Sequence, residues 1–467
     1  MLKVILLLIY LSLIIAVIFV ERKTPTEALL WVFILICLPY LGALLYLIFG
    51  STIAIKRTAY LRKKKLAKLQ LEKTKQPLLP NDTILSEEDK QVMHFNAVYN
   101  ESLITSYQDT ALFIDGKSHY EQLFQDIKQA KHSIYIEFYT IHHDEVGKAF
   151  INQLVQKAKE GVTIYVLCDF IANLSTPQKM FQPLLDAGGK IIRVKPYLTH
   201  YRLHRKIVVI DNEIAYIGGM NIGKQYANMA KKKNPWRDTQ VRLRGCCVDV
   251  LMKHFLKDYL CAIKQKQWDQ TLTTLTSLPT NHQDMTKHLC QFVVGGVDND
   301  KEAIKMGYLS MIRSAKKHIR IQTPYFIPDA SILDALKTAA AAGVEIELMI
   351  PGIKASFFLD PVTTYYCGQL LEYGAKVHKY NGYIHAKTMI IDDELCCIGS
   401  VNMDMRSLMV DDEICGIFYD NDFVDHYTRI YQEDILTCHN YTYQHFLNRS
   451  LKEKISASFF LLFAPLM

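Results

Sequence analysis

Two long apolar runs open the chain. Residues 4–20 hold 17 positions without a charge and residues 28–49 hold 22, so both can cross a bilayer as helices, the first at the lower length limit. A cleavable signal peptide is the alternative for the first run, because Lys3 resembles the basic start of one. No A-x-A cleavage site follows it, however, and a second apolar run does. The pattern therefore predicts an uncleaved two-helix transmembrane hairpin over residues 1–55.

The pattern beyond residue 100 is one of short alternating runs, and it occurs twice. Each time, two β-branched runs flank a helical stretch and a glycine ends the helix, as helix C-termini favour. The expected strands are 133–139, 161–167, 318–325 and 343–350, and the expected helices are 145–159 and 332–342. Strands that alternate with helices are typical of an α/β fold with a largely internal sheet. We expect one half over 101–275, a similar half over 276–450, and an apolar tail over 451–467.

The repeat contains one motif of high specificity. His204-x-Lys206-x4-Asp211 recurs as His385-x-Lys387-x4-Asp392, 181 residues later at every matched position. At ordinary residue usage such a motif arises by chance about once in ten thousand positions. In both copies a small residue and an asparagine follow at matched positions, and we expect these to bind the substrate phosphate: Gly219, Asn221, Ser400 and Asn402.

The residue types of the motif suit chemistry at phosphorus. In a strand, His and Lys two positions apart project from the same face. A neutral imidazole is a competent nucleophile, and a second imidazole can supply the proton of the leaving group. The paired lysines would hold non-bridging phosphate oxygens and balance developing charge. We include Asp211 and Asp392 in the candidate catalytic set, although an aspartate that opens a tight turn commonly binds backbone groups instead.

Charge is concentrated in one segment. The chain carries a formal charge of +7, but residues 51–80 hold nine basic side chains and one acid, so this segment is +8 and the rest is −1. Basic residues that flank a span stay on the cytoplasmic side, which predicts a cytoplasmic catalytic unit. The basic linker over 56–100 is either a solvated helix face or a contact for anionic lipid headgroups.

Metal and nucleotide sites are not expected. The eleven cysteines form no C-x-x-C pair, and we interpret them as reduced thiols, most of them buried. A P-loop-like stretch begins at Gly218 but has Gln225 where the magnesium-binding hydroxyl is required. The proposed chemistry also needs no metal or other cofactor.

On these motifs the sequence resembles the phospholipase D superfamily and, within it, the bacterial cardiolipin synthases. Further similarity lies in the hairpin end 41–50 and in the stretches 235–239 and 402–407. The resemblance implies that two phospholipase D-like halves pack face to face and form one site. It also implies that one histidine becomes phosphorylated, usually that of the first motif, here His204, while His385 acts as general acid and then base. The sequence alone does not fix that order.

The resemblance further implies an acid beyond each motif that orients a histidine, which can belong to the opposite half. Asp238 and Glu413 fit those positions, and the alternative is a surface or ion-paired carboxylate. The chain departs from the family pattern before Glu413, at residues 410–412, and after Gly223, at residues 224–226. These departures touch the acid-bearing loops and leave the choice of acceptor open.

The expected function is phosphatidyl transfer between two phosphatidylglycerol molecules, giving cardiolipin and glycerol at the bacterial cell membrane. The expected partners are therefore phosphatidylglycerol and anionic membrane lipid. The alternatives are a phospholipase D-type hydrolase or nuclease, another phosphatidyltransferase, and a non-catalytic membrane scaffold. A nucleic-acid partner is not expected, because the chain beyond residue 80 has no net positive charge.

Overall fold

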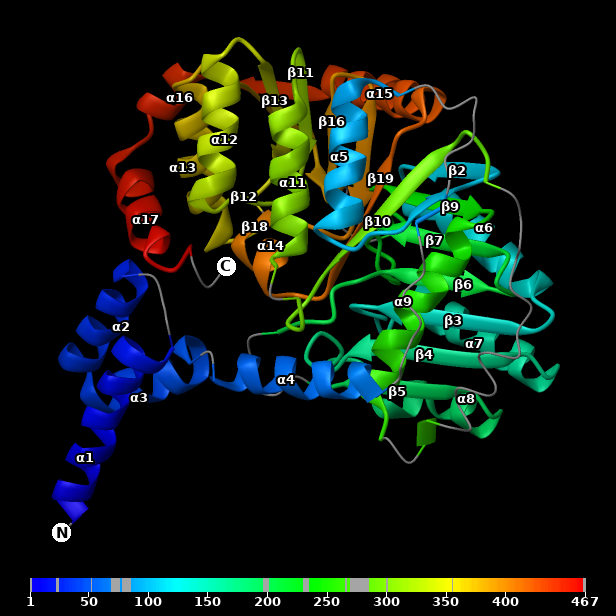
Figure 1. Ribbon diagram of the computed structural model, residues 1–467, viewed down its shortest axis with the longest axis horizontal. Coiled ribbons are helices and arrows are strands. Elements are labelled where there is room, and N and C mark those ends of the chain that lie inside the picture. The colour runs from blue at the N-terminus through cyan, green and yellow to red at the C-terminus, as the bar shows by residue number, and fades with distance from the viewer. Residues whose placement is uncertain are drawn as a thin grey trace.

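The computed structural model describes residues 2–21, 25–51, 53–68, 76–77, 85–195, 201–229, 235–264, 267–268, 285–299, 301–354 and 356–464. Figure 1 shows two large α/β units side by side, with a small helical bundle and one long helix, α4, at their lower edge.

The apolar N-terminus is helical but segmented. Its elements are α1 (Leu2–Ile15), η1 (Ala16–Val20), α2 (Pro25–Cys37), α3 (Pro39–Leu45) and η2 (Tyr46–Gly50). The second run is interrupted at Leu38, which has non-helical backbone angles before Pro39, a residue that cannot donate the next helical hydrogen bond. Among the described residues, no helix has both the length and the apolar character needed to cross a bilayer, so the two predicted spans are not confirmed.

The first half is a seven-stranded sheet in the order β2-β9-β7-β6-β3-β4-β5. The strands are β2 (Asp109–Phe113), β3 (Ser133–Phe138), β4 (Thr163–Asp169), β5 (Lys190–Val194), β6 (Ile207–Ile210), β7 (Ile214–Gly218) and β9 (Gln240–Arg244). Helices α6 (Gly116–Gln129), α7 (Glu145–Lys159), η3 (Gln178–Met180) and α8 (Gln182–Asp186) cover the outer face, and α9 (Cys247–Ala262) covers the inner face. The predicted strand–helix–strand unit is confirmed here, and helix 145–159 has the predicted bounds.

The second half is a nine-stranded sheet in the order β1-β10-β19-β17-β16-β11-β13-β14-β20. The strands are β1 (Ile104–Ser106), β10 (Leu289–Gly295), β11 (His318–Gln322), β13 (Glu345–Pro351), β14 (Lys376–Tyr380), β16 (Thr388–Ile391), β17 (Leu395–Gly399), β19 (Glu413–Phe418) and β20 (Cys438–Tyr441). Its helices are α5 (Glu87–Val98), α11 (Ala303–Ser314), α12 (Ala330–Ala341), α13 (Leu359–Leu371), α14 (Met405–Met409), α15 (Asn421–Leu436), α16 (Tyr443–Leu447) and α17 (Leu451–Leu461). The predicted helix 332–342 is confirmed as α12, which begins two residues earlier.

The central strands of the two halves correspond. In the first, β3 lies between parallel β4 and antiparallel β6, and in the second, β11 lies between parallel β13 and antiparallel β16. One apolar cluster joins them: it contains Ile207 and Ile217 of the first sheet, Ile390 and Ile398 of the second, and buried side chains of α9 and α15. The inner faces of the two sheets therefore form a common core.

Two expected boundaries are corrected. Strand β1 falls inside the predicted first half, yet it pairs with β10 of the second sheet, with Thr105 opposite Cys290. Helix α5 falls inside the predicted linker, yet Val92 and Met93 belong to the apolar core of the second half. Pairing of an edge strand and docking of a helix both depend on surfaces distant in sequence, which the local pattern does not specify. The apolar tail forms α17, whose Phe460 packs against Val362 of α13.

Candidate active site

Both motif histidines line one cavity of about 480 Å³ between the two halves. Each His–Lys pair lies in the extended segment that leads into β6 or β16, just before the strand, and not within the strand as the spacing predicts. The His side chains are only 12% exposed, and Lys206 and Lys387 are buried. Each lysine ammonium donates to the backbone carbonyl of its own histidine, which fixes the charge directly beside the imidazole.

Each histidine is hydrogen-bonded to a carboxylate of the opposite half. Nδ1 of His204, in the first half, lies 2.7 Å from Oε1 of Glu413 in the second. Nδ1 of His385, in the second half, lies 2.5 Å from Oδ2 of Asp238 in the first. The remaining ring nitrogen of each imidazole, Nε2, is then the one available to the cavity.

Backbone pairing across the halves places these acids. Strand β15 (Tyr383–Ile384), which precedes His385, pairs in parallel with β8 (Trp236–Arg237), and the His385 amide donates to the Arg237 carbonyl over 2.6 Å. In the other half, Leu203 bridges Asp412 and the His204 amide donates to the Asp412 carbonyl over 2.9 Å. Each histidine segment is therefore anchored to the acid-bearing segment of its partner half.

Gly219 and Ser400 support the acids and do not line the cavity, which corrects the expectation that they bind phosphate. A Cβ at position 219 would collide with Oδ1 of Asp238, so the glycine permits the close approach of that carboxylate. Ser400 Oγ donates to Oε2 of Glu413. Gly219 and Ser400 occupy matched positions of the repeat, and they position Asp238 and Glu413 in different ways: the glycine leaves space for the carboxylate, and the serine donates a hydrogen bond to it.

Asn221 and Asn402 do line the cavity. Asn221 donates through Nδ2 to the Tyr226 hydroxyl over 2.6 Å and accepts through Oδ1 from the Thr140 amide over 3.3 Å. Oδ1 of Asn402 is buried and has no hydrogen-bond partner among the described residues, so it is an acceptor that a bound ligand can satisfy.

The motif aspartates lie away from the cavity. Asp211 accepts hydrogen bonds from three consecutive backbone amides, those of residues 131–133, over 2.7–2.8 Å. Asp392 does the same with residues 316–318 over 2.6–2.8 Å. Both residues have positive φ. Their hydrogen bonds connect the start of β3 or β11 to the turn that follows β6 or β16. The inclusion of Asp211 and Asp392 in the catalytic set is therefore corrected: their carboxylates are occupied by backbone groups.

Burial sets the protonation of the site. It lowers the pKa of His204 well below the usual range, and the charges of Lys206 and Lys387 lower it further. Burial also lowers the pKa of His385 to about 4, although Asp238 opposes the shift. The pKa of Lys206 falls to about 7 and that of Lys387 to about 8, again chiefly through burial. Both imidazoles are therefore neutral at pH 7, beside ammonium groups that are easily deprotonated.

Sequence reasoning assigned no role to several residues that complete the wall of the cavity. The Tyr139 ring meets the His204 ring edge-on, with centroids 4.7 Å apart, and the Lys206 ammonium lies 5.4 Å from its centre. Arg202 and Arg406 also line the cavity, and Arg406 is paired with Asp411 over 3.1 Å. Tyr139 directly follows β3, so its position at the end of a repeated strand was a signal that could have indicated it.

Comparison with known proteins decides the family. A sequence profile described as "Cardiolipin synthase, PLD-like domain" matches residues 123–233 and 308–435, and one described as "Phospholipase_D-nuclease N-terminal" matches residues 8–51. The major cardiolipin synthase of Bacillus subtilis is 34% identical and aligns over 97% of this chain and 96% of its own length. This chain belongs to the cardiolipin synthase family of the phospholipase D superfamily. It is 35% identical to the cardiolipin synthase of Clostridium perfringens over 96% of both chains.

Solved structures agree with the fold expected for this family. A phosphatidylserine synthase of Haemophilus influenzae superimposes with a TM-score of 0.60 at 16% identity, covering 80% of this chain and 97% of the other. A polyphosphate kinase of Porphyromonas gingivalis gives a TM-score of 0.50 at 15% identity, with 79% and 53% covered. At such identities the likeness concerns the fold alone, and it confirms the α/β fold of two phospholipase D-like halves.

Proposed function

We propose that this member of the family makes cardiolipin by moving the phosphatidyl group of one phosphatidylglycerol onto a second. The observation that carries the proposal is the pair of crossed His–carboxylate contacts around one cavity, His204 with Glu413 and His385 with Asp238. Two neutral imidazoles, each with Nδ1 bonded to an acid, are suited to act in turn on one phosphorus atom.

We assign the nucleophile to His204. Burial and the charges of both lysines lower the pKa of each histidine, but the pKa of His204 falls well below its usual range, whereas the carboxylate of Asp238 opposes the shift at His385, whose pKa falls to about 4. His204 is thus the imidazole held more firmly in its unprotonated, nucleophilic form. The negative phosphodiester favours a proton on His385 when the substrate binds.

In the first step, Nε2 of His204 forms a bond to phosphorus as the bond to the glycerol headgroup oxygen breaks. His385 gives its proton to that oxygen, and glycerol leaves. In the second step, His385 takes the proton of the acceptor hydroxyl, whose oxygen attacks phosphorus while the P–N bond breaks. Lys206 and Lys387 offset the charge that develops on the phosphoryl oxygens, and a lipid-facing site keeps water from the intermediate.

Membrane attachment of the catalytic unit is part of the same proposal. The N-terminal segment exposes apolar side chains, with Phe19 74% and Leu29 70% exposed, and α4 (Ile53–Lys68) carries seven of the nine basic residues of 51–80. In the view of Figure 1 the C-terminal helix α17 is drawn above α2 of this segment. We propose that the two apolar runs anchor the chain in the bacterial membrane, with the catalytic unit on the cytoplasmic side.

The test uses phosphatidylglycerol labelled with ³²P in purified preparations of three proteins: wild type, His204→Ala and His385→Ala. The assignment expects an acid-labile, protein-bound label in wild type and its accumulation in His385→Ala at a slower rate, with no label in His204→Ala. Label on His204→Ala would reverse the assignment of the two histidines. Full cardiolipin synthesis by both variants would refute the site.

A further inference from the structure

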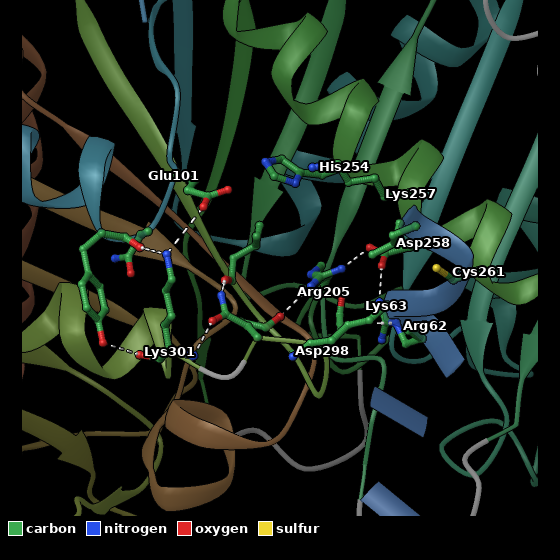
Figure 2. Close-up of a pocket in the computed structure, with 17 residues that line it drawn as sticks. Arg62, Lys63, Glu101, Arg205, His254, Lys257, Asp258, Cys261, Asp298 and Lys301 are labelled. Carbon is green, nitrogen blue, oxygen red and sulfur yellow. Dashed lines mark hydrogen bonds and ion pairs between the residues drawn. The ribbon is translucent and has the colours of Figure 1, made fainter. Parts of the chain in front are cut away.

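A cluster of charged side chains lies behind the His204 motif, where α4 meets both halves. Arg62 of α4 donates to Asp412 over 2.8 Å and to Asp258 over 2.7 Å, and it forms an ion pair with Asp298 at 3.3 Å. Figure 2 shows Asp258 linked to both Arg62 and Arg205. Asp258 belongs to α9 of the first half, and Asp298 and Asp412 belong to the second, so one side chain from outside both halves connects them.

The pseudo-symmetry of the fold shows why a cation is needed there. Asp412 directly precedes Glu413 as Arg237 directly precedes Asp238. Arg237 crosses to the inner helix of the opposite half and pairs with Asp434 of α15 over 2.8 Å. At the corresponding junction, Asp412 faces Asp258 of the inner helix α9. One junction therefore joins opposite charges, whereas the other brings together two carboxylates that require a cation from elsewhere.

Arg205 alone does not meet that requirement. It pairs with Asp258, but its nearest approach to Asp412 is 3.8 Å. Without Arg62, Arg205 would face four acids, Asp258, Asp298, Asp412 and Glu137, of which Asp412 and Glu137 are fully buried. Asp412 would keep the Tyr201 hydroxyl as a donor, which carries no positive charge. Oδ1 of Asp412 occupies the space that a Cβ on Gly296 would need, so the glycine permits the close approach of this carboxylate. A buried charge without its partner is strongly destabilising.

Asp412 is connected to the catalytic pair through the backbone. Its carbonyl accepts the amide of His204 over 2.9 Å, and the next residue is Glu413. Arg205, between His204 and Lys206, donates through Nε to the Glu413 carbonyl over 3.1 Å. A shift of Asp412 therefore moves both members of the His204–Glu413 contact.

We infer that Arg62 is a positioning residue for His204: helix α4, which follows the membrane-proximal hairpin, completes the active site by supplying the cation that holds Asp412 in place. The inference rests on the proposed role of the His204–Glu413 pair. It makes α4 a structural member of the catalytic site, in addition to any contact of its basic face with lipid.

The experiment compares the full-length variants Arg62→Gln, Arg62→Gln/Asp412→Asn and Arg62→Lys in detergent–phosphatidylglycerol mixed micelles, where attachment to a bilayer is not required. We expect Arg62→Gln to lower kcat by about 10–100-fold with little change in KM, because misplacement of a catalytic group by about 1 Å has costs of this size. The double variant removes the uncompensated buried charge and should recover most of the lost kcat. Arg62→Lys should be intermediate, since an ammonium lacks the planar fork that contacts several carboxylates.

The control is Lys257→Gln, which removes an exposed cation from a second cavity that Arg62, Arg205 and Asp258 also line, and which should leave kcat unchanged. Wild-type kcat in Arg62→Gln would overturn the inference, and so would a loss that Asp412→Asn does not restore. All kcat ratios are measured on whichever phospholipid product the wild type forms. If that product is not cardiolipin, the proposed function fails while the positioning role of Arg62 is still tested.

Discussion

Loss of the Glu413 charge is the perturbation that tests the site most fully. In Glu413→Gln the side chain keeps its size, and the amide oxygen can still accept from Nδ1 of His204 at the position now 2.7 Å away. What disappears is the negative charge that stabilises the positive imidazole ring of His204 while its Nε2 is bonded to phosphorus. The same charge raises the pKa of Lys206, against the burial that lowers this pKa to about 7.

The expected loss follows from these contacts. A positioned acid–base group contributes about 10²–10⁴ in rate, and replacement of a histidine-orienting carboxylate by its amide costs up to about 10⁴ in the Ser-His-Asp hydrolases. We therefore expect kcat of Glu413→Gln to fall by about 10²–10⁴. Without the charge of Glu413 the pKa of Lys206 is lower, so the ammonium loses its proton at lower pH. The alkaline limb of the profile of kcat against pH should therefore shift to lower pH.

The assay measures kcat and KM on phosphatidylglycerol in mixed micelles across the pH range in which the protein stays folded. Glu433→Gln is the matched control, because it makes the same change at an exposed position of α15 in the same half. A variant with kcat within about threefold of wild type and an unmoved alkaline limb would refute the reasoning, since it would show that the Glu413 charge acts on neither His204 nor Lys206.

Four further outcomes are expected. Lys206→Met should raise Tm by at least about 2 °C while abolishing activity, because it removes a buried ammonium that folding disfavours; an unchanged or lower Tm contradicts this. Asp392→Asn should lower stability by about 1–3 kcal/mol through its three amide contacts and leave kcat of the folded enzyme unchanged; a selective loss of kcat would return it to the catalytic set. Wild-type kcat should decline as pH rises through about 7 to 8, where the two lysines lose their protons, and as pH falls below about 7, where burial makes Glu413 take up a proton and lose its charge beside His204; a flat profile contradicts the assignment. Phe357→Ser, at a ring 75% exposed close to the cavity residue Leu359, should lower activity on vesicles and spare activity in micelles, and equal effects in both would argue against a membrane contact there.

Local patterns specified most of the catalytic unit. Periodicity located the repeated strand–helix–strand units, and the duplicated His–Lys spacing indicated that His204 and His385 belong to one kind of site. These features are encoded within a few neighbouring residues, which is why they can be predicted without a structure. The resemblance to the family added the positions of Asp238 and Glu413.

Other features depend on contacts between distant segments. The pattern gave no sign that β1 joins the sheet of the second half, because an edge strand of three residues takes its place from its neighbour β10. The different supports of the two acids, Gly219 beside Asp238 and Ser400 beside Glu413, depend on how the halves pack. Arg62 lies 350 residues from Asp412, so the charge compensation between them is visible only in the folded chain.

The contacts that lead from α4 to His204 suggest a second role for the basic segment 51–80, in addition to contact with lipid. Its charge of +8 predicts the membrane orientation of the chain and contact with lipid headgroups. In the folded chain, however, Arg62 of this segment points into the protein and pairs with Asp412. Under the proposed function, helix α4 and the nucleophile His204 are thereby coupled through Asp412 and Glu413. Removal of the N-terminal region would thus be expected to impair the catalytic unit itself, beyond any loss of attachment.

The most direct test of the account is the product balance of the purified full-length protein with phosphatidylglycerol vesicles. Phosphatidyl transfer through a composite His204–His385 site predicts cardiolipin and free glycerol in equal molar amounts, with both products lost in His204→Ala and in His385→Ala. Phosphatidic acid as the sole lipid product would contradict the account, because it would show that water, and not a second lipid, accepts the phosphatidyl group.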